Sequence, residues 1–94
     1  MSKSVISNEQ ECYRCHTRYN LHRHHIFSTA YRKKAEELGY WVYLCVDCHT
    51  GSRGVHTTHE GKLYWDELKR IAQRKYEENG TREDFIKTFG RNYL

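Results

Sequence analysis

The chain has 94 residues, of which 37% are hydrophobic and 30% are charged, and it contains no proline. This balance predicts one folded domain over residues 1–94 with a thin core, and it disfavours a disordered chain. Sixteen lysines and arginines against twelve aspartates and glutamates give a net charge of +4, which favours a polyanionic partner. No segment has the apolar length of a membrane span or the apolar core of a secretory signal, so we expect no membrane partner and a cytoplasmic location.

Hydrophobic periodicity and helix-ending residues divide the chain into short elements. Helices are expected where apolar residues recur at helical spacing, and a strand where aromatic and β-branched residues run together. Ser28 as N-cap and Gly39 as a stop bound the first helix, and Gly80 ends the longest one. The expected elements, in chain order, are a polar lead-in over 1–11, a turn over 12–15, an extended segment over 20–26, a helix over 29–38, a strand over 40–44, a turn over 45–48, a loop over 49–61, and helices over 62–79 and 82–89. Together they predict an α+β fold.

Two C-x-x-C pairs are the strongest chemical signal in the sequence. They consist of Cys12, Cys15, Cys45 and Cys48. Each pair can form a tight knuckle whose thiolates point at one ion, and two knuckles complete a closed tetrahedral shell, which predicts a structural zinc. A redox role is disfavoured because no thioredoxin-like pattern surrounds either pair. His16 or His49, each of which follows a pair, is an alternative fourth ligand.

Seven histidines are more than scattered surface placement readily explains. They are His16, His22, His24, His25, His49, His56 and His59. His24 and His25 are neighbours in the extended segment, so they point to opposite faces unless a bend turns both into one cleft. Together with His49 and His56 they make a second, open metal site plausible. The simpler interpretation is one packed and one solvated histidine, followed by a flexible polar loop that contains His56 and His59.

Three motifs follow one another along the chain. They are Cys12-x-x-Cys15, His24-His25-Ile26 and Leu44-Cys45-x-x-Cys48-His49. Over roughly residues 12–59 this pattern resembles the HNH endonucleases of the ββα-metal (His-Me finger) class, and the small size and appended helices are similar to short HNH proteins of bacteriophages and prophages. The resemblance implies a zinc-stapled, treble-clef-like ββα-metal core with two or three additional helices. It also implies a nuclease that acts on DNA, with phage packaging or recombination proteins as candidate partners.

The resemblance further implies a role for individual histidines. His25 matches the general base that activates water, His24 the first metal ligand and His49 the later ligand. His56 is the expected further ligand, and His59 is the second choice, because the match there rests on proximity in the chain. The catalytic divalent ion would then be Mg²⁺, Mn²⁺, Ni²⁺ or Zn²⁺, and all-imidazole ligation favours the transition metals.

The chain departs from the family at one position. The family's middle Asn, which orients the general base, would fall near Tyr40, and no Asn stands there. Either another group such as a backbone carbonyl holds His25, or catalytic power is reduced. The second case favours an alternative function, a non-catalytic zinc-finger module that binds nucleic acid or protein. A third option is an adaptor whose long helix docks on a partner.

Basic residues of the expected loop and helices are candidates to bind the DNA backbone. Arg53 in the histidine loop can clamp a phosphate, and Arg23 adjoins the histidine pair. The other candidates are Lys33, Lys34, Arg70 and Arg74. Such contacts give affinity that falls with salt and carries little base specificity. The simpler interpretation is a solvated charged face on the long helix, with packing roles for Trp41 and Trp65.

Overall fold

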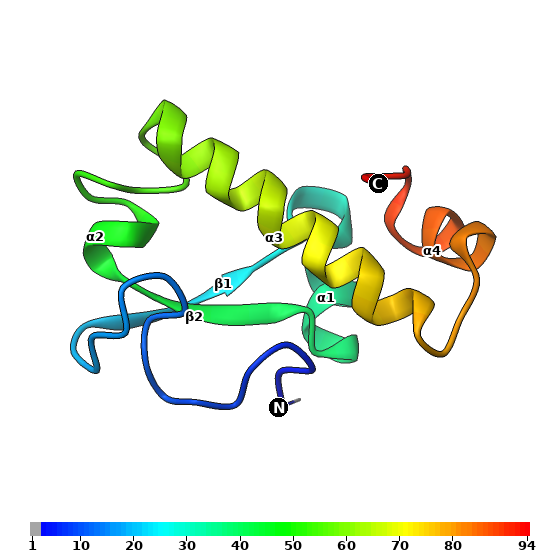
Figure 1. The fold of residues 1–94 in the computed structure, drawn as a ribbon, viewed down its shortest axis with the longest axis horizontal. Helices are drawn as coiled ribbons and strands as arrows, with labels where there is room; N and C mark the ends of the chain where they lie inside the picture. The colour runs from blue at the N-terminus through cyan, green and yellow to red at the C-terminus, as the bar shows by residue number, and fades with distance from the viewer. Residues whose placement is uncertain (1–2) are drawn as a thin grey trace.

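A two-stranded antiparallel sheet lies at the centre of residues 3–94, the part of the chain that the computed structural model describes (Figure 1). Strand β1 spans Leu21–His25 and strand β2 spans Trp41–Cys45, so the strand expected over 40–44 is found one residue later. The register pairs Leu21 with Cys45 and His25 with Trp41. It therefore sets the histidine pair against the start of β2 and the second cysteine knuckle against the start of β1.

Helices surround this hairpin. They are a 3-10 turn η1 at Thr29–Tyr31, α1 at Arg32–Leu38, α2 at Val46–His49, α3 at His59–Glu77 and α4 at Arg82–Phe89. Figure 1 shows α3 crossing over the hairpin, with α2 near its beginning and α4 near its end. Within residues 3–94 no helix combines the length and apolar character that crossing a bilayer requires. The fold is small and α+β, as the sequence predicts at this level.

The helix expected over 29–38 is divided into η1 and α1. Thr29 has a φ of 54°, in the left-handed region, so a right-handed α-helix does not run through it and α1 begins only at Arg32. Ala35 is the buried residue of α1. Gly39 ends the helix with a φ of 83°, and its amide donates to the carbonyl of Ala35. This geometry turns the chain from α1 directly into β2.

The long helix α3 begins before the expected range of 62–79. The side chain of Thr58 accepts a hydrogen bond from the amide of Gly61, which caps the helix ahead of its apolar stripe. That cap is why α3 starts at His59. The last helix, expected over 82–89, has those bounds in the structure.

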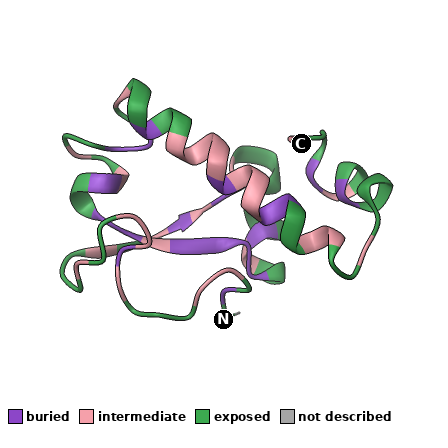
Figure 2. Ribbon diagram, in the orientation of Figure 1, coloured by how far each residue is buried: buried purple, intermediate pink, exposed green. Residues whose placement is uncertain are grey.

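The buried core joins the hairpin to the C-terminal helices (Figure 2). Leu44 of β2 and Leu68 of α3 are fully buried. Phe27, just after β1, stacks on Phe89 of α4 with ring centroids 4.1 Å apart. Burying such a side chain contributes about 1.5–3 kcal/mol relative to leaving it exposed. Residues after position 60 therefore help to hold the hairpin that carries the histidines.

Candidate metal centres

Four cysteine sulfurs converge where the two knuckles meet. The Sγ atoms of Cys12, Cys15, Cys45 and Cys48 all lie within 4.8 Å of one another, and Cys15 Sγ is 3.6 Å from Cys45 Sγ. Tetrahedral Zn–S bonds of about 2.3 Å place sulfurs about 3.8 Å apart, whereas a disulfide requires about 2 Å. The four cysteines are free thiols. Their cluster can therefore hold one zinc ion, as the spacing predicts.

The backbone of the first knuckle favours a thiolate. The amide of Cys15 donates to Cys12 Sγ at 3.4 Å. Burial acts to raise the pKa of Cys12, but the amides of Cys15, Cys45 and Arg14 outweigh it and lower that pKa to about 7. Burial raises the pKa of Cys48, so this sulfur needs a bound cation to remain a thiolate at neutral pH. The donor set thus fits a zinc ion.

A second group of donors gathers around His24. One ring nitrogen from each of His24, His49 and His56 lies within 4.8 Å of the others. His24 is 1% exposed, and its Nε2 has no hydrogen-bond partner among residues 3–94. A buried polar atom without a partner is costly unless an ion or water satisfies it. These three imidazoles, called the histidine trio below, can therefore hold a divalent cation.

Backbone hydrogen bonds bring His56 beside His49 although the two are well separated in the chain. Helix α2 ends at His49, and the loop that follows turns back onto it. The amide of Val55 donates to the carbonyl of Cys48 at 3.0 Å, and the amide of His56 donates to that of His49 at 3.2 Å. The second knuckle thus positions both histidines. His16, by contrast, lies 3.7 Å from Glu11 and belongs to neither donor group.

The environment of His24 and His49 keeps these two imidazoles neutral. Burial, followed by the charges of His49 and His56, lowers the pKa of His24 to about 3. Burial, followed by the charges of His56 and His22, lowers the pKa of His49 to about 4. The neutral ring is the form that ligates a metal.

His22 is a site residue that the sequence reasoning missed. Its Nδ1 lies 3.1 Å from Nδ1 of His49, so one ring donates to the other and the orientation of His49 is fixed. The sequence does hold a signal for it. Residues two apart on a strand share a face, so His22 lies on the same side of β1 as His24.

Helix α3 contributes an aromatic side chain, Trp65, that packs against the trio. The ring of Trp65 lies 4.8 Å from the rings of both His24 and His56. Its Nε1 donates to the carbonyl of Ile26 at 2.7 Å, which anchors the indole to the end of β1. Trp65 therefore packs against the candidate ligands and restricts their rotation.

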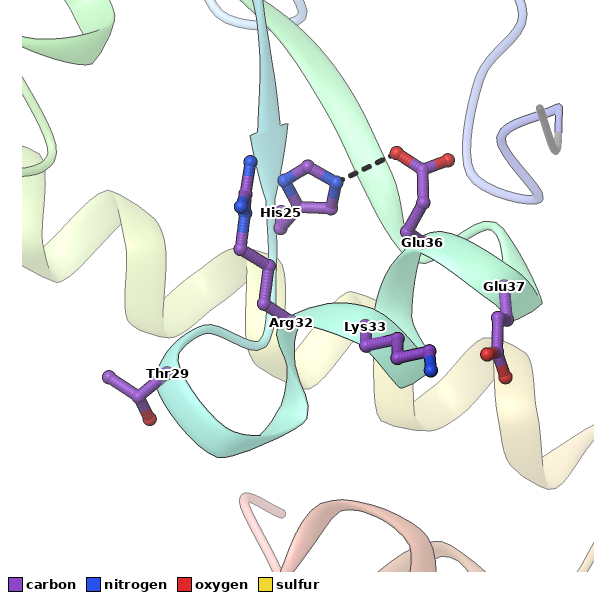
Figure 3. A pocket seen from close by; sticks show the side chains of 6 residues that line it. All are labelled: His25, Thr29, Arg32, Lys33, Glu36 and Glu37. Atoms are coloured by element: carbon purple, nitrogen blue, oxygen red, sulfur yellow. Dashed lines mark hydrogen bonds and ion pairs between the residues drawn. The ribbon is translucent and has the colours of Figure 1, made fainter.

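Two hollows open beside the trio. A cavity of about 260 Å³ is lined by Arg23, His24, His25, Ser28, Arg32, His49 and His56. A larger hollow of about 610 Å³ is lined by His25, Thr29, Arg32, Lys33, Glu36 and Glu37 (Figure 3). His25 and Arg32 line both, so they stand where the two hollows adjoin. We call the first the histidine cavity and the second the α1 hollow.

Unlike His24, His25 has a carboxylate as its hydrogen-bond partner. Its Nε2 lies 2.9 Å from Oε1 of Glu36 on α1, while Oε2 of Glu36 lies 2.7 Å from Nη1 of Arg23. The guanidinium of Arg23 lies 3.7 Å above the ring of Trp41. The two histidines thus follow strand alternation and still line one cavity. A carboxylate holds His25, in place of the backbone carbonyl suggested from the sequence.

Comparison of the chain with protein-family models, with curated proteins and with solved structures finds no match.

Several basic residues expected to bind DNA are engaged in ion pairs. Arg70 lies 2.8 Å from Glu67, and Arg74 lies 3.9 Å from the same carboxylate. Lys34 lies 3.7 Å from Glu37. Exposed pairs of this kind contribute little stability, about 0–1 kcal/mol, and a phosphate can compete with them.

Other cations lie nearer to the cavity. Lys33 lines the α1 hollow, and Arg32, which the sequence reasoning did not single out, lines both hollows. Within residues 3–94 neither makes an ion pair with a carboxylate. Arg53 is exposed in the loop, where its carbonyl accepts from Arg14 Nη1 at 2.6 Å. His59, the second choice of ligand, lies in the first turn of α3 and outside the trio.

Proposed function

We propose that this chain is a metal-dependent DNA endonuclease with an HNH-like, ββα-metal core. The observation that supports the proposal most is the convergence of the His24, His49 and His56 nitrogens beside a cavity that His25 also lines. The order β1, β2, α2 agrees with the motif resemblance, because it carries the base and first ligand on β1 and the later ligand at the end of α2. In this proposal the four-cysteine zinc is structural.

Different residues of the chain would carry out the separate steps of phosphodiester hydrolysis. A divalent ion held by His24, His49 and His56 would polarise the phosphate and stabilise the leaving oxygen. His25 takes a proton from the attacking water. Arg32, at the junction of the two hollows, binds a non-bridging phosphate oxygen. Trp65 excludes water from the buried side of the trio.

Single-turnover nicking of supercoiled plasmid tests the proposal. The zinc-loaded protein is incubated with Mn²⁺, Ni²⁺, Zn²⁺ or Mg²⁺, because imidazole ligands favour the transition metals but Mg²⁺ can bind through phosphate and water. A single site cuts one strand, so we expect conversion to the nicked form. His25→Ala should slow this step by about a hundredfold or more, because it removes the proton acceptor.

Matched histidine variants separate a metal-site effect from a general one. His56→Ala should lose metal-dependent cutting, while His59→Ala, an exposed histidine close by in sequence but outside the trio, should cut as wild type does. Equal background cutting by wild type and His25→Ala would contradict the proposal. Binding of DNA without any cutting would then favour the non-catalytic zinc-finger module.

A further inference from the structure

We infer that Glu36 is the positioning residue for His25 and that it makes Nδ1 of His25 the basic nitrogen. The kinetic consequence rests on the proposed nuclease function. The assignment of the proton to Nε2 does not, because it is a property of the folded chain alone.

The contact between Glu36 and His25 determines which nitrogen carries the proton. Oε1 of Glu36 lies 2.9 Å from Nε2 of His25. An ionised carboxylate only accepts hydrogen bonds, so a neutral His25 must donate through Nε2–H. The lone pair is then on Nδ1. His25 is therefore held as a single tautomer, with Nδ1 available to accept a proton.

Arg23 holds the carboxylate of Glu36 in place. Its Nη1 lies 2.7 Å from Oε2 of Glu36, and its guanidinium stacks 3.7 Å above the ring of Trp41. A planar guanidinium held between an indole and a carboxylate has little freedom to rotate. Because Arg23 occupies Oε2, Glu36 meets His25 through Oε1. Arg23, which the sequence offers as a DNA-binding candidate, is thus placed to orient the base.

The other ring nitrogen of His25 lies on the side of Arg32, a second residue that lines the histidine cavity. In Figure 3, Nε2 of His25 points to Glu36, and the other ring nitrogen lies on the opposite side of the ring, toward Arg32. His25 and Arg32 both line the histidine cavity. When Nδ1 accepts a proton from water, the ring becomes an imidazolium, and the negative charge of Glu36 stabilises it. Glu36 therefore supplies the orientation that a middle Asn near Tyr40 would supply in the family that the sequence resembles.

Long-range ¹H–¹⁵N NMR of the zinc-loaded protein, without DNA, tests the proton assignment directly. Wild-type His25 should carry its proton on Nε2, with an Nε2–H signal that exchanges slowly with water. In Glu36→Ala that signal should be lost to exchange. Glu37→Ala is the matched control, because Glu37 lines the same hollow but pairs with Lys34, and it should leave His25 unchanged. An Nδ1–H proton in wild type, or equally slow exchange in Glu36→Ala, would overturn the inference.

Nicking kinetics test the positioning role. Glu36→Ala should lower kcat by about tenfold to a hundredfold while KM stays within about twofold, since only the base is misoriented. Glu36→Gln retains an acceptor oxygen, so it should keep the slow Nε2–H signal and recover part of kcat. If Glu36→Ala fails to retain zinc, Glu36→Gln is compared with wild type in its place. Wild-type kcat in a zinc-loaded Glu36→Ala protein overturns the positioning role. A wild type that cuts no DNA contradicts the proposed function instead, and the NMR result then decides the Glu36 assignment by itself.

Discussion

His24 is a histidine whose burial links the stability of the fold to pH. Burial and the charges of His49 and His56 lower its pKa to about 3, whereas an unfolded histidine titrates near about pH 6.5. Between these values the unfolded chain binds a proton that the folded chain does not. The free energy of unfolding is therefore at its full value above about pH 6.5 and falls as the pH drops toward 3.

The pH effect is measurable by substitution. Between about pH 7.5 and 5.5, wild type should lose about 1 kcal/mol more unfolding free energy than His24→Gln, because glutamine does not titrate. Urea denaturation of protein loaded with one equivalent of zinc, for the four cysteines, and no further metal measures the difference. Both proteins carry the same thiols, so acid effects on the zinc site cancel. Equal losses in the two proteins would contradict the neutral burial of His24.

Arg32 is expected to contact DNA more strongly than the paired lysine Lys34. Arg32→Ala should weaken DNA binding by about 1 kcal/mol and reduce the slope of log affinity against log salt by about one, because one phosphate contact is lost. Fluorescence anisotropy across a salt series, on protein carrying His25→Ala to prevent cutting, measures both quantities. Lys34→Ala is the control, since Lys34 pairs with Glu37. An unchanged salt slope in Arg32→Ala would exclude the contact.

At the residue scale the sequence indicates candidate metal ligands better than it indicates the residues that orient the base or bind phosphate. The cysteine pairs are recognisable because each pair is a short, local motif, whereas the candidate ligands His24, His49 and His56 come from the motif resemblance and from proximity in the chain. Glu36 and Arg32 carry no such signal, because their roles depend on how α1 packs against the end of β1. Their identification required coordinates.

The start of α3 fixes the loop that carries His56. The amide of Gly61 donates to the Thr58 side chain, and a Cβ at Gly61 would overlap the carbonyl oxygen of Gly54. Only glycine permits this close approach of helix and loop. The helix start expected at residue 62 is too late because the residues of this first turn lack an apolar stripe, and capping by Thr58 sets the boundary instead.

Gly61→Ala should therefore change the geometry of the trio, although Gly61 is not one of its ligands. Overlap with the loop backbone should cost about 1–3 kcal/mol of unfolding free energy and weaken Ni²⁺ binding at the trio, since His56 is displaced. Urea denaturation and Ni²⁺ titration of the zinc-loaded protein measure the two effects. Lys62→Ala, at the exposed neighbouring position, should change neither. Wild-type Ni²⁺ affinity in Gly61→Ala would show that the trio does not depend on this approach.

For the whole molecule, the cysteine cluster brings the two knuckles together at one point beside the hairpin. The turn over 12–15 and α2 lie far apart in sequence, and a single zinc would connect them beside the hairpin. The amide of Tyr13 also donates to the carbonyl of Tyr43 at 2.8 Å. Because residues 45–48 lead into His49, loss of the zinc should disorganise the trio as well.

Removing zinc with a strong chelator should unfold the hairpin. Structural zinc contributes about 10 kcal/mol or more to the folding of small zinc domains, which is comparable to the whole stability of a domain this size. Far- and near-UV circular dichroism should show the loss, and Ni²⁺ binding at the trio should disappear with it. His56→Ala should keep its zinc and its spectrum. A chelated protein with an unchanged near-UV spectrum would show that the cluster is not a structural zinc site.

At this scale the sequence predicts the α+β class and the succession of elements, because hydrophobic periodicity is a local property. It does not predict that α4 packs against the end of β1 through Phe27 and Phe89. Such contacts join residues far apart in the chain and depend on how the α3–α4 connection turns.

Anomalous diffraction from crystals grown with zinc and, in parallel, with Mn²⁺ or Ni²⁺ tests whether both donor groups bind metal. We expect a zinc peak among the four sulfurs and a second metal peak within about 2.0–2.3 Å of one nitrogen from each of His24, His49 and His56. A single peak at the sulfurs, with the three imidazoles hydrogen-bonded to water at saturating Mn²⁺ and Ni²⁺, would contradict this expectation.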